Sequence, residues 1–202
     1  RAADELDMLD INEGELTFLT APPAEPPHEQ STHILMTEDS LKSGWITMRQ
    51  CHYHLAPVGA MQVLFNKDRA RNIKIVQSDN IKRAWVERAS VQLEGVGKEA
   101  VLCIQSENRS LRRNSTDGTY EWRGGPYMRR FLDGYFPMHV KVAIDYPARQ
   151  LQLRTIEPTP LKLNATTLPG HVRMDAVFEG RLLIVAQFVP ATSVPPDIGW
   201  NP

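Results

Sequence analysis

Apolar residues in this chain recur at every second position along most of its length, and hardly anywhere at the helical spacing. The clearest run is Met138, Val140, Val142, Ile144 and Tyr146, with polar or small residues between them. Successive side chains of a β-strand point to opposite faces, so such a run buries one face and exposes the other. The pattern predicts an all-β protein.

Two groups of such runs divide the chain. Residues 31–108 hold short runs at spacings of about 8–12 residues, which predicts an antiparallel β-sandwich. Residues 137–190 hold a second group, which predicts a smaller antiparallel β-domain. Gly, Pro, Asn and Asp separate the runs. The expected strands are Thr32–Thr37, Trp45–Leu55, Ala60–Asn66, Ile73–Gln77, Lys82–Glu87, Val91–Glu94 and Glu99–Asn108, then Met138–Tyr146, Gln150–Ile156, Leu161–Leu163, His171–Phe178 and Arg181–Val189.

Residues 109–136 interrupt the alternation and form a junction rich in arginine and aromatic side chains. Pro126 suits the first position of a helix, and Gly134 suits the left-handed residue that ends one. We therefore expect one short helix over Tyr127–Asp133. The chain ends in a Pro-rich tail, residues 191–202, for which we expect irregular structure.

Residues 1–30 form an acidic leader that ends in a Pro-rich spacer. The leader carries eight acidic groups against Arg1 alone, whereas the whole chain has a formal net charge of −1. The rest of the chain is therefore net basic, and the leader is either attracted to it or solvated as a tail. Four prolines between Ala21 and Pro27 favour an extended polyproline spacer.

The chain contains two cysteines, Cys51 and Cys103, and each lies in a strand-like run. An even number of cysteines in a β-protein favours a disulfide, and this pair joins strands far apart in sequence. Closing a loop of about 50 residues is expected to stabilise the fold by roughly 4 kcal/mol. The alternative is two buried free thiols, since cysteine is among the most buried residue types.

The residues before the second cysteine resemble a known motif. Leu93-Glu-Gly-Val96 followed by Ala100-Val-Leu-Cys103 is similar to the approach to the second cysteine of immunoglobulin domains, with Cys51 in the place of the first. The resemblance implies an immunoglobulin-like arrangement of the sandwich and no particular family within that fold.

The segment from Arg109 to Arg130 carries six arginines against two acidic residues. Guanidinium groups bind carboxylates and phosphates through paired hydrogen bonds, and aromatic rings add stacking surfaces. We therefore expect a surface here that binds an anionic or polysaccharide ligand. Its candidate residues are Arg112, Arg113, Arg123, Tyr120, Trp122 and Tyr127. Alternatively, the arginines pair with acids or lay their stems across apolar surface. The nearly neutral whole chain argues against nucleic acid as the partner.

His52 and His54 stand two positions apart in a strand-like run, so both side chains are expected to project from one face. That arrangement can supply two ligands to a zinc or copper ion. The sequence selects no third ligand, and a solvated strand face is the plainer interpretation. We predict no resident cofactor.

Signatures of several enzyme classes are missing, because the chain holds no GxSxG, CxxC or HExxH motif. Gly95-Val-Gly-Lys-Glu-Ala100 matches a dinucleotide-binding pattern, but a strand-like run follows it where that site requires a helix. The enzyme alternative is a hydrolase or carbohydrate-active enzyme with a cleft between the two β halves. Its paired carboxylates would come from Asp133, Asp145, Asp175 and Glu179.

These features favour a non-enzymatic binding protein over an enzyme. The start at Arg1 and the cysteine pair favour an exported protein, periplasmic or at the cell surface, tethered to a membrane through a removed N-terminus. The expected partner is a protein or an anionic polysaccharide. The sequence predicts no oligomeric state.

Overall fold

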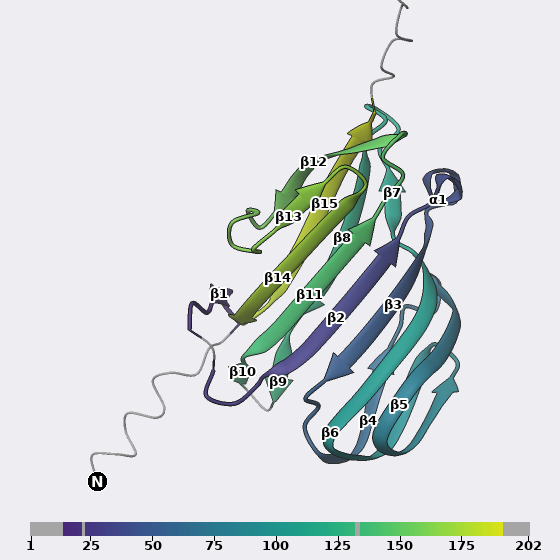
Figure 1. Cartoon of the computed structure of the whole chain (residues 1–202). Helices are drawn as coiled ribbons and strands as arrows, with labels where there is room; N and C mark the ends of the chain where they lie inside the picture. Colours follow the sequence, from purple (N-terminus) through teal and green to yellow (C-terminus); the bar gives the residue numbers. More distant parts are fainter. Residues whose placement is uncertain (1–13, 22, 132–133, 192–202) are drawn as a thin grey trace, which may run out of the picture.

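The computed structural model describes residues 14–21, 23–131 and 134–191, and this part of the chain is almost entirely β-strand (Figure 1). The strands form sheets that are mainly antiparallel, so the all-β prediction is confirmed. Among these residues, no helix is long and apolar enough to cross a membrane.

The larger sheet, sheet A, has nine strands. They are β1 (Thr17–Phe18), β2 (His28–Leu35), β3 (Trp45–Tyr53), β4 (Val58–Leu64), β5 (Ala70–Glu87), β6 (Ser90–Arg109), β11 (Met138–Asp145), β13 (Thr166–Leu168) and β14 (His171–Glu179). Their order is β1-β14-β11-β2-β3-β6-β4, with β13 beside β14 and β5 beside β6. The β2–β11 pair is parallel, and it makes sheet A continuous between residues 31–108 and 137–190.

The second sheet, sheet B, has four strands in the order β12-β15-β8-β7. They are β7 (Leu111–Arg113), β8 (Tyr120–Tyr127), β12 (Leu151–Glu157) and β15 (Leu182–Pro190). A separate two-stranded ribbon pairs β9 (Arg129–Phe131) with β10 (Gly134–Phe136). The arginine-rich junction therefore consists largely of strands.

The prediction of a short helix over Tyr127–Asp133 is wrong. Pro126 lies inside β8, whose last residue, Tyr127, pairs with Leu182 of β15. The backbone that follows pairs with β10, so ladder partners outside the segment replace the hydrogen bonds of a helix. Asp133 lies outside the described residues.

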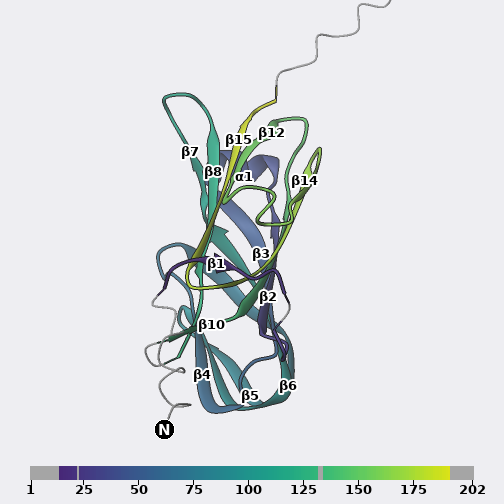
Figure 2. The same ribbon diagram turned by 90° about the vertical axis from the view of Figure 1, so that its left-hand side faces the viewer.

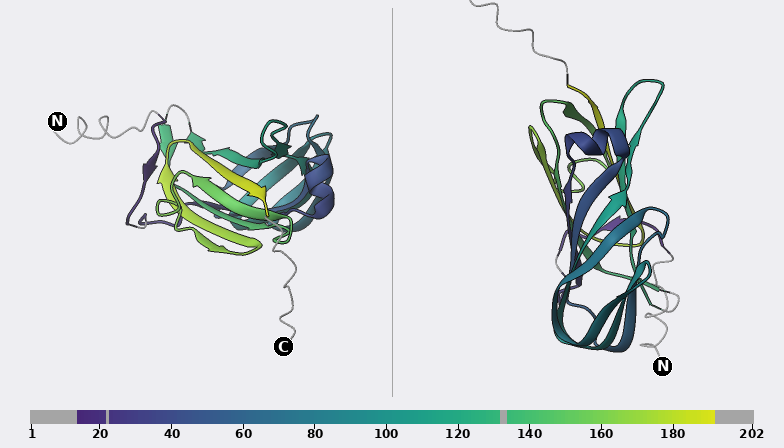
Figure 3. Two further views of the ribbon diagram at one scale, coloured as in Figure 1. Left: turned by 90° about the horizontal axis from the view of Figure 1, so that it is seen from above. Right: turned by 90° about the vertical axis from the view of Figure 1, so that its right-hand side faces the viewer.

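A hydrophobic core fills the space between sheets A and B, which face each other (Figure 3). The alternating residues of β11 are buried on one face, as the period-two pattern predicts. Sheet B adds Trp122 and Ile184, and Phe188 brings its ring centroid within 5.0 Å of the Tyr146 ring. Each fully buried side chain of this size contributes about 1.5–3 kcal/mol to folding.

Strands β4, β5 and β6 curl into a lobe with its own apolar core at one end of sheet A (Figure 2). One side of β6 pairs with β4 and then β3, and the other side pairs with β5 along nearly its whole length. Leu93, Leu102 and Ile104 of β6 lie at the centre of this second core.

Strands β5 and β6 are longer than expected, because each joins two of the predicted strands. The register of the β5–β6 pair shifts between Asp79 and Ile81, and Asn80 has a φ of +54°. A β-bulge absorbs turn-forming residues of this kind without ending the strand. The strand expected at Leu161–Leu163 is a turn, and the local strand is β13.

The described residues contain one helix, α1 (Glu38–Ser43), which the period-two pattern does not predict. Thr37 caps its first turn in a reciprocal arrangement with Ser40, and Gly44 ends it with a φ of +76°. Both are recognised signals of helix ends. The helix turns the chain from β2 into β3 (Figure 1).

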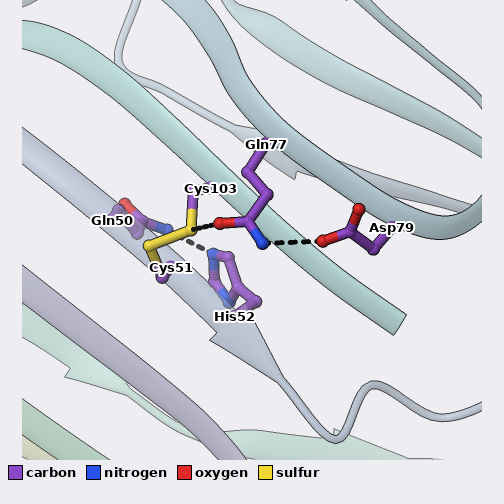
Figure 4. Close-up of a disulfide and its surroundings, with 6 residues drawn as sticks. All are labelled: Gln50, Cys51, His52, Gln77, Asp79 and Cys103. Atoms are coloured by element: carbon purple, nitrogen blue, oxygen red, sulfur yellow. Dashed lines mark hydrogen bonds between the residues drawn. A yellow bond between two sulfur atoms is a disulfide. The ribbon is translucent and has the colours of Figure 1, made fainter. Parts of the chain in front are cut away.

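A disulfide joins Cys51 to Cys103, which are direct partners across β3 and β6 with 4.1 Å between their Cα atoms (Figure 4). The Oε1 atom of Gln77 lies 3.6 Å from Sγ of Cys103. In immunoglobulin domains the disulfide connects two sheets. Here it connects neighbouring strands of one sheet, so the immunoglobulin-like arrangement is not confirmed.

Candidate functional site

The chain passes from sheet A to sheet B between Arg109, the last residue of β6, and Leu111, the first residue of β7. Arg109 pairs with Trp45 of β3, whereas Leu111 pairs with Trp122 of β8. The Leu111 N–H also donates to the carbonyl of Gly44, at 3.2 Å. This crossover gathers the end of α1, the turn before β5 and the strand β7 around one point.

A groove of about 920 Å³ opens at the crossover, and we call it the basic groove. It is lined by five cationic residues, namely Lys42, Arg69, Arg109, Arg112 and Arg113. Two acidic residues, Glu38 and Asp68, also line it, so its net charge is positive. Leu41, Leu111 and Tyr120 supply apolar surface.

Two backbone hydrogen bonds fix the turn that carries Arg69. The Arg69 N–H donates to the carbonyl of Asn66 at 3.0 Å, and the Arg109 N–H donates to the carbonyl of Arg69 at 2.8 Å. The side chain of Asn66 also accepts from the N–H of Asp68. The turn is therefore attached to the end of β6, which holds Arg69 and Arg109 on the same wall of the groove.

None of the five cations forms a salt bridge with a carboxylate in the described part of the chain. The lysine and arginine salt bridges found there join Arg71 to Glu107, Arg123 to Glu121 and Lys141 to Glu29. All five groove cations are exposed. The acidic Glu38 instead accepts a hydrogen bond from Nε2 of Gln150, at 2.5 Å. The groove thus concentrates positive charge that no internal carboxylate neutralises through an ion pair.

The six candidate residues of the arginine segment do not all lie at the groove. Arg112, Arg113 and Tyr120 line the basic groove together. Arg123 lies outside the groove lining and donates through Nε to Oε1 of Glu121, at 2.5 Å. This hydrogen bond lowers the pKa of Glu121 and raises that of Arg123.

Trp122 and Tyr127 belong to the core between the sheets rather than to the groove. Their exposed fractions are 3% and 7%, and burial raises the pKa of the Tyr127 hydroxyl. Trp122 pairs with buried Leu111 on the inner face of sheet B, whereas Arg123, one position further along β8, is exposed on the other face. Lys42 and Arg69 lie outside the arginine-rich segment of the sequence and reach the groove from segments far from β7.

The two histidines considered as metal ligands lie in different surroundings. His52 is buried, and its ring stacks on the ring of His28, with His28 Nε2 3.0 Å from His52 Nδ1. Burial lowers the pKa of His28 to about 4 and that of His52 to about 3. His54 follows the end of β3 with a φ of +53°, and its Nδ1 atom lies 3.8 Å from Oε2 of Glu99. No cluster suited to a metal ion occurs among the described residues.

The carboxylates considered for catalysis lie with histidines on the outer face of sheet A. Asp145 contacts both His33 and His171, while Asp175 accepts from His139 at 2.7 Å. Burial acts to raise the pKa of Asp145, but the hydrogen bonds from the two histidines outweigh it and lower the pKa. Glu179 ends β14.

Comparisons with known proteins identify no family for this chain. No protein-family model and no curated protein match the chain. A mutant of an M1 zinc metallopeptidase from Deinococcus radiodurans, bound to a Tyr-Ser-Ala substrate, aligns with a TM-score of 0.43 and 11% identity over 93% of this chain. A two-domain M1 zinc metallopeptidase mutant bound to L-tryptophan aligns with a TM-score of 0.41 and 12% identity over 88% of this chain. The chain spans 52% and 43% of these two structures.

Proposed function

We propose that this protein is a binding module whose basic groove holds an anionic ligand. The observation that carries the proposal is the group of five exposed cations that line one groove without a salt bridge to a described carboxylate. Guanidinium groups favour carboxylate and phosphate oxygens because their fixed donors bind two oxygens at once. Three of the five groove cations are the arginines at and just after the crossover.

The spread of the cations indicates a ligand with more than one anionic group. They come from α1, from the turn before β5 and from the β6–β7 crossover, which are three separate segments. Tyr120 is the aromatic residue of the groove, whereas nucleic acid grooves stack successive bases on several rings. A multivalent anion without bases to stack, such as a polycarboxylate, therefore fits this groove better than a nucleic acid does.

We favour binding over hydrolysis because two of the candidate carboxylates, Asp145 and Asp175, lie on the outer face of sheet A rather than in a cleft between the two β halves. Asp145 is held by two histidines and Asp175 by one, on the face of sheet A that points away from sheet B. The disulfide supports an exported protein, since such bonds persist in oxidising compartments.

Titration with polygalacturonate, a carboxylate polysaccharide, tests the proposal. The single variants Arg112→Ser and Arg113→Ser are each expected to weaken binding about tenfold, because each removes a charged hydrogen-bonding group. Affinity is expected to fall as salt rises, since exposed charges are screened. Sulfated heparin fragments in a parallel titration show whether the groove prefers carboxylates.

Arg123→Ser is the matched control, because it removes an arginine of the same segment that lies outside the groove lining and pairs with Glu121. This variant is expected to bind polygalacturonate as the unchanged protein does. Equal losses in all three variants would mean that binding follows overall charge rather than the groove. If neither polymer binds at low salt, and an acidic peptide does not bind either, the proposed function is wrong.

A further inference from the structure

The strand β7 is an edge strand of sheet B, and it borders the basic groove. It pairs with β8 on one side, with Leu111 opposite Trp122, Arg112 opposite Glu121 and Arg113 opposite Tyr120. Its other side faces α1 and Gly44, which line the same groove. The groove therefore contains a sheet edge as well as a group of cations.

Hydrogen bonds on either side of Arg113 show which way its backbone points. The Leu111 N–H donates to Gly44 rather than to β8, so residue 111 faces away from β8. The Asn114 N–H donates to Thr119, in the turn that joins β7 to β8, so residue 114 faces toward β8. Because this direction alternates along an antiparallel strand, the N–H and C=O of Arg113 point away from β8, toward the groove.

Resting on the proposed function, we infer that the anionic ligand is an extended acidic peptide of a partner protein, which adds as a strand to β7 at Arg113, beyond the Leu111–Gly44 hydrogen bond. Main-chain hydrogen bonds at the edge give such complexes affinity, and side chains beside the edge select the sequence. Here the Arg113 amide and carbonyl supply the edge groups. The surrounding cations Lys42, Arg69, Arg109 and Arg112 complement glutamate or aspartate side chains.

The edge distinguishes a peptide from a polysaccharide of the same charge. A polyuronate offers carboxylates to the arginines but has no backbone amide to pair with Arg113. An extended peptide satisfies both the charges and the edge at once. The edge of β7 is short, so the charged contacts fix which peptides bind and the strand pairing fixes their direction.

The test uses the full chain and a synthetic peptide, acetyl-(Glu-Thr)4-amide, at low salt. Arg113→Gln removes the charge and keeps the backbone N–H, whereas Arg113→Pro removes both. Proline is tolerated at an edge position whose N–H points outward, and Arg112 before it is already extended. We expect Arg113→Gln to weaken peptide binding a fewfold and Arg113→Pro to weaken it threefold to tenfold further. The two variants are expected to bind polygalacturonate equally.

A second measurement needs no variant. The same peptide methylated at every backbone nitrogen keeps its four carboxylates but loses its donors, and it is expected to bind at least tenfold more weakly. Hydrogen exchange at the Arg113 amide is expected to slow when the unmethylated peptide binds, and to stay unchanged with polygalacturonate. Two results would overturn strand addition and leave the proposed function standing. In the first, the methylated and unmethylated peptides bind equally well. In the second, polygalacturonate binds and the peptide does not. Failure of every anion to bind would remove both.

Discussion

The ring of His28 stacks on the ring of His52, with the two centroids 5.3 Å apart and a hydrogen bond of 3.0 Å between their nitrogens. The two residues come from the neighbouring strands β2 and β3, on the face that carries the apolar core at Ile34 and Ile46. Nε2 of His52 also lies 2.6 Å from the side-chain amide of Gln50. Burial disfavours the protonated form of both rings, and the charge of Arg129 disfavours it further at His28, so both rings remain neutral in the folded protein well below their ordinary pKa.

We predict that acid destabilises the protein through this pair. The unfolded chain binds protons on both histidines below pH 6.5, whereas burial keeps His28 neutral down to a pKa of about 4 and His52 to about 3. The unfolded state therefore binds more protons in this window, and the free energy of unfolding falls as the pH falls from 6.5 to 4. For His28 alone the loss is on the order of 3 kcal/mol. Urea unfolding at pH 8, 6 and 4.5 measures it.

The double variant His28→Gln and His52→Gln separates this effect from general acid sensitivity. Whatever its stability at pH 8, its free energy of unfolding is expected to change much less between pH 8 and pH 4.5. His33→Gln, a change of an exposed histidine, is the control and is expected to keep most of the pH dependence. If the free energy of unfolding of the double variant depends on pH as that of the unchanged protein does, the acid sensitivity does not come from His28 and His52.

The period-two pattern predicted most of the strands because burial on one face is a local property of the sequence. It also fixed the inner face of β11, where every second residue is buried. Pairing between strands is not local, so the pattern missed the continuity of β5 past Asp79 and of β6 past Gly95, where bulges absorb turn residues. The helix α1 carried a readable signal in Thr37 and Gly44, but its six residues show no helical repeat.

Only part of the basic groove could be predicted, because its lining also depends on contacts that are not local in the sequence. The charge of the segment around Arg112 and Arg113 is visible in the sequence, and these residues do line the groove. Lys42 and Arg69 join them only through the chain crossover and the turn fixed to β6. The strand period places Tyr120 and Trp122 on one face of β8, so it does not show that Tyr120, the first residue of the strand, is half-buried at the groove while Trp122 is buried in the core.

Removing the disulfide is expected to cost about 4 kcal/mol of unfolding free energy, because it frees a loop of 52 residues in the unfolded chain. The variant Cys51→Ala with Cys103→Ala, compared with the unchanged protein in urea, measures this cost. Because both sulfur-bearing residues are buried, at 8% and 1% exposure, reductant without denaturant is expected to leave the bond intact. A difference below 1 kcal/mol between the two proteins would contradict the expected stabilisation.

Gly180 is expected to tolerate no side chain. It has a φ of +90°, and a Cβ atom built there would overlap the backbone carbonyl of Glu15. Gly180→Ala is therefore expected to lower the free energy of unfolding by roughly 2–4 kcal/mol, through backbone strain and displacement of residues next to β1. Gly59→Ala is the control, since a Cβ at Gly59 meets no atom within 4 Å. It is expected to change stability by less than about 0.5 kcal/mol, and thermal unfolding of the pair gives the comparison.

Two aromatic residues on the same strand are expected to respond in opposite ways. Trp122 is packed in the core between the sheets, so Trp122→Ala is expected to cost about 3–5 kcal/mol of stability. Its effect on polygalacturonate affinity, measured where the variant is still folded, is expected to be small.

Tyr120 is half-buried beside the groove cations, so Tyr120→Ala is expected to weaken binding severalfold at a smaller cost in stability. The separation follows from position along one face of β8, because Trp122 lies opposite buried Leu111, whereas Tyr120 begins the strand opposite exposed Arg113. A larger loss of affinity in folded Trp122→Ala than in Tyr120→Ala would show that the ligand reaches the core rather than the groove.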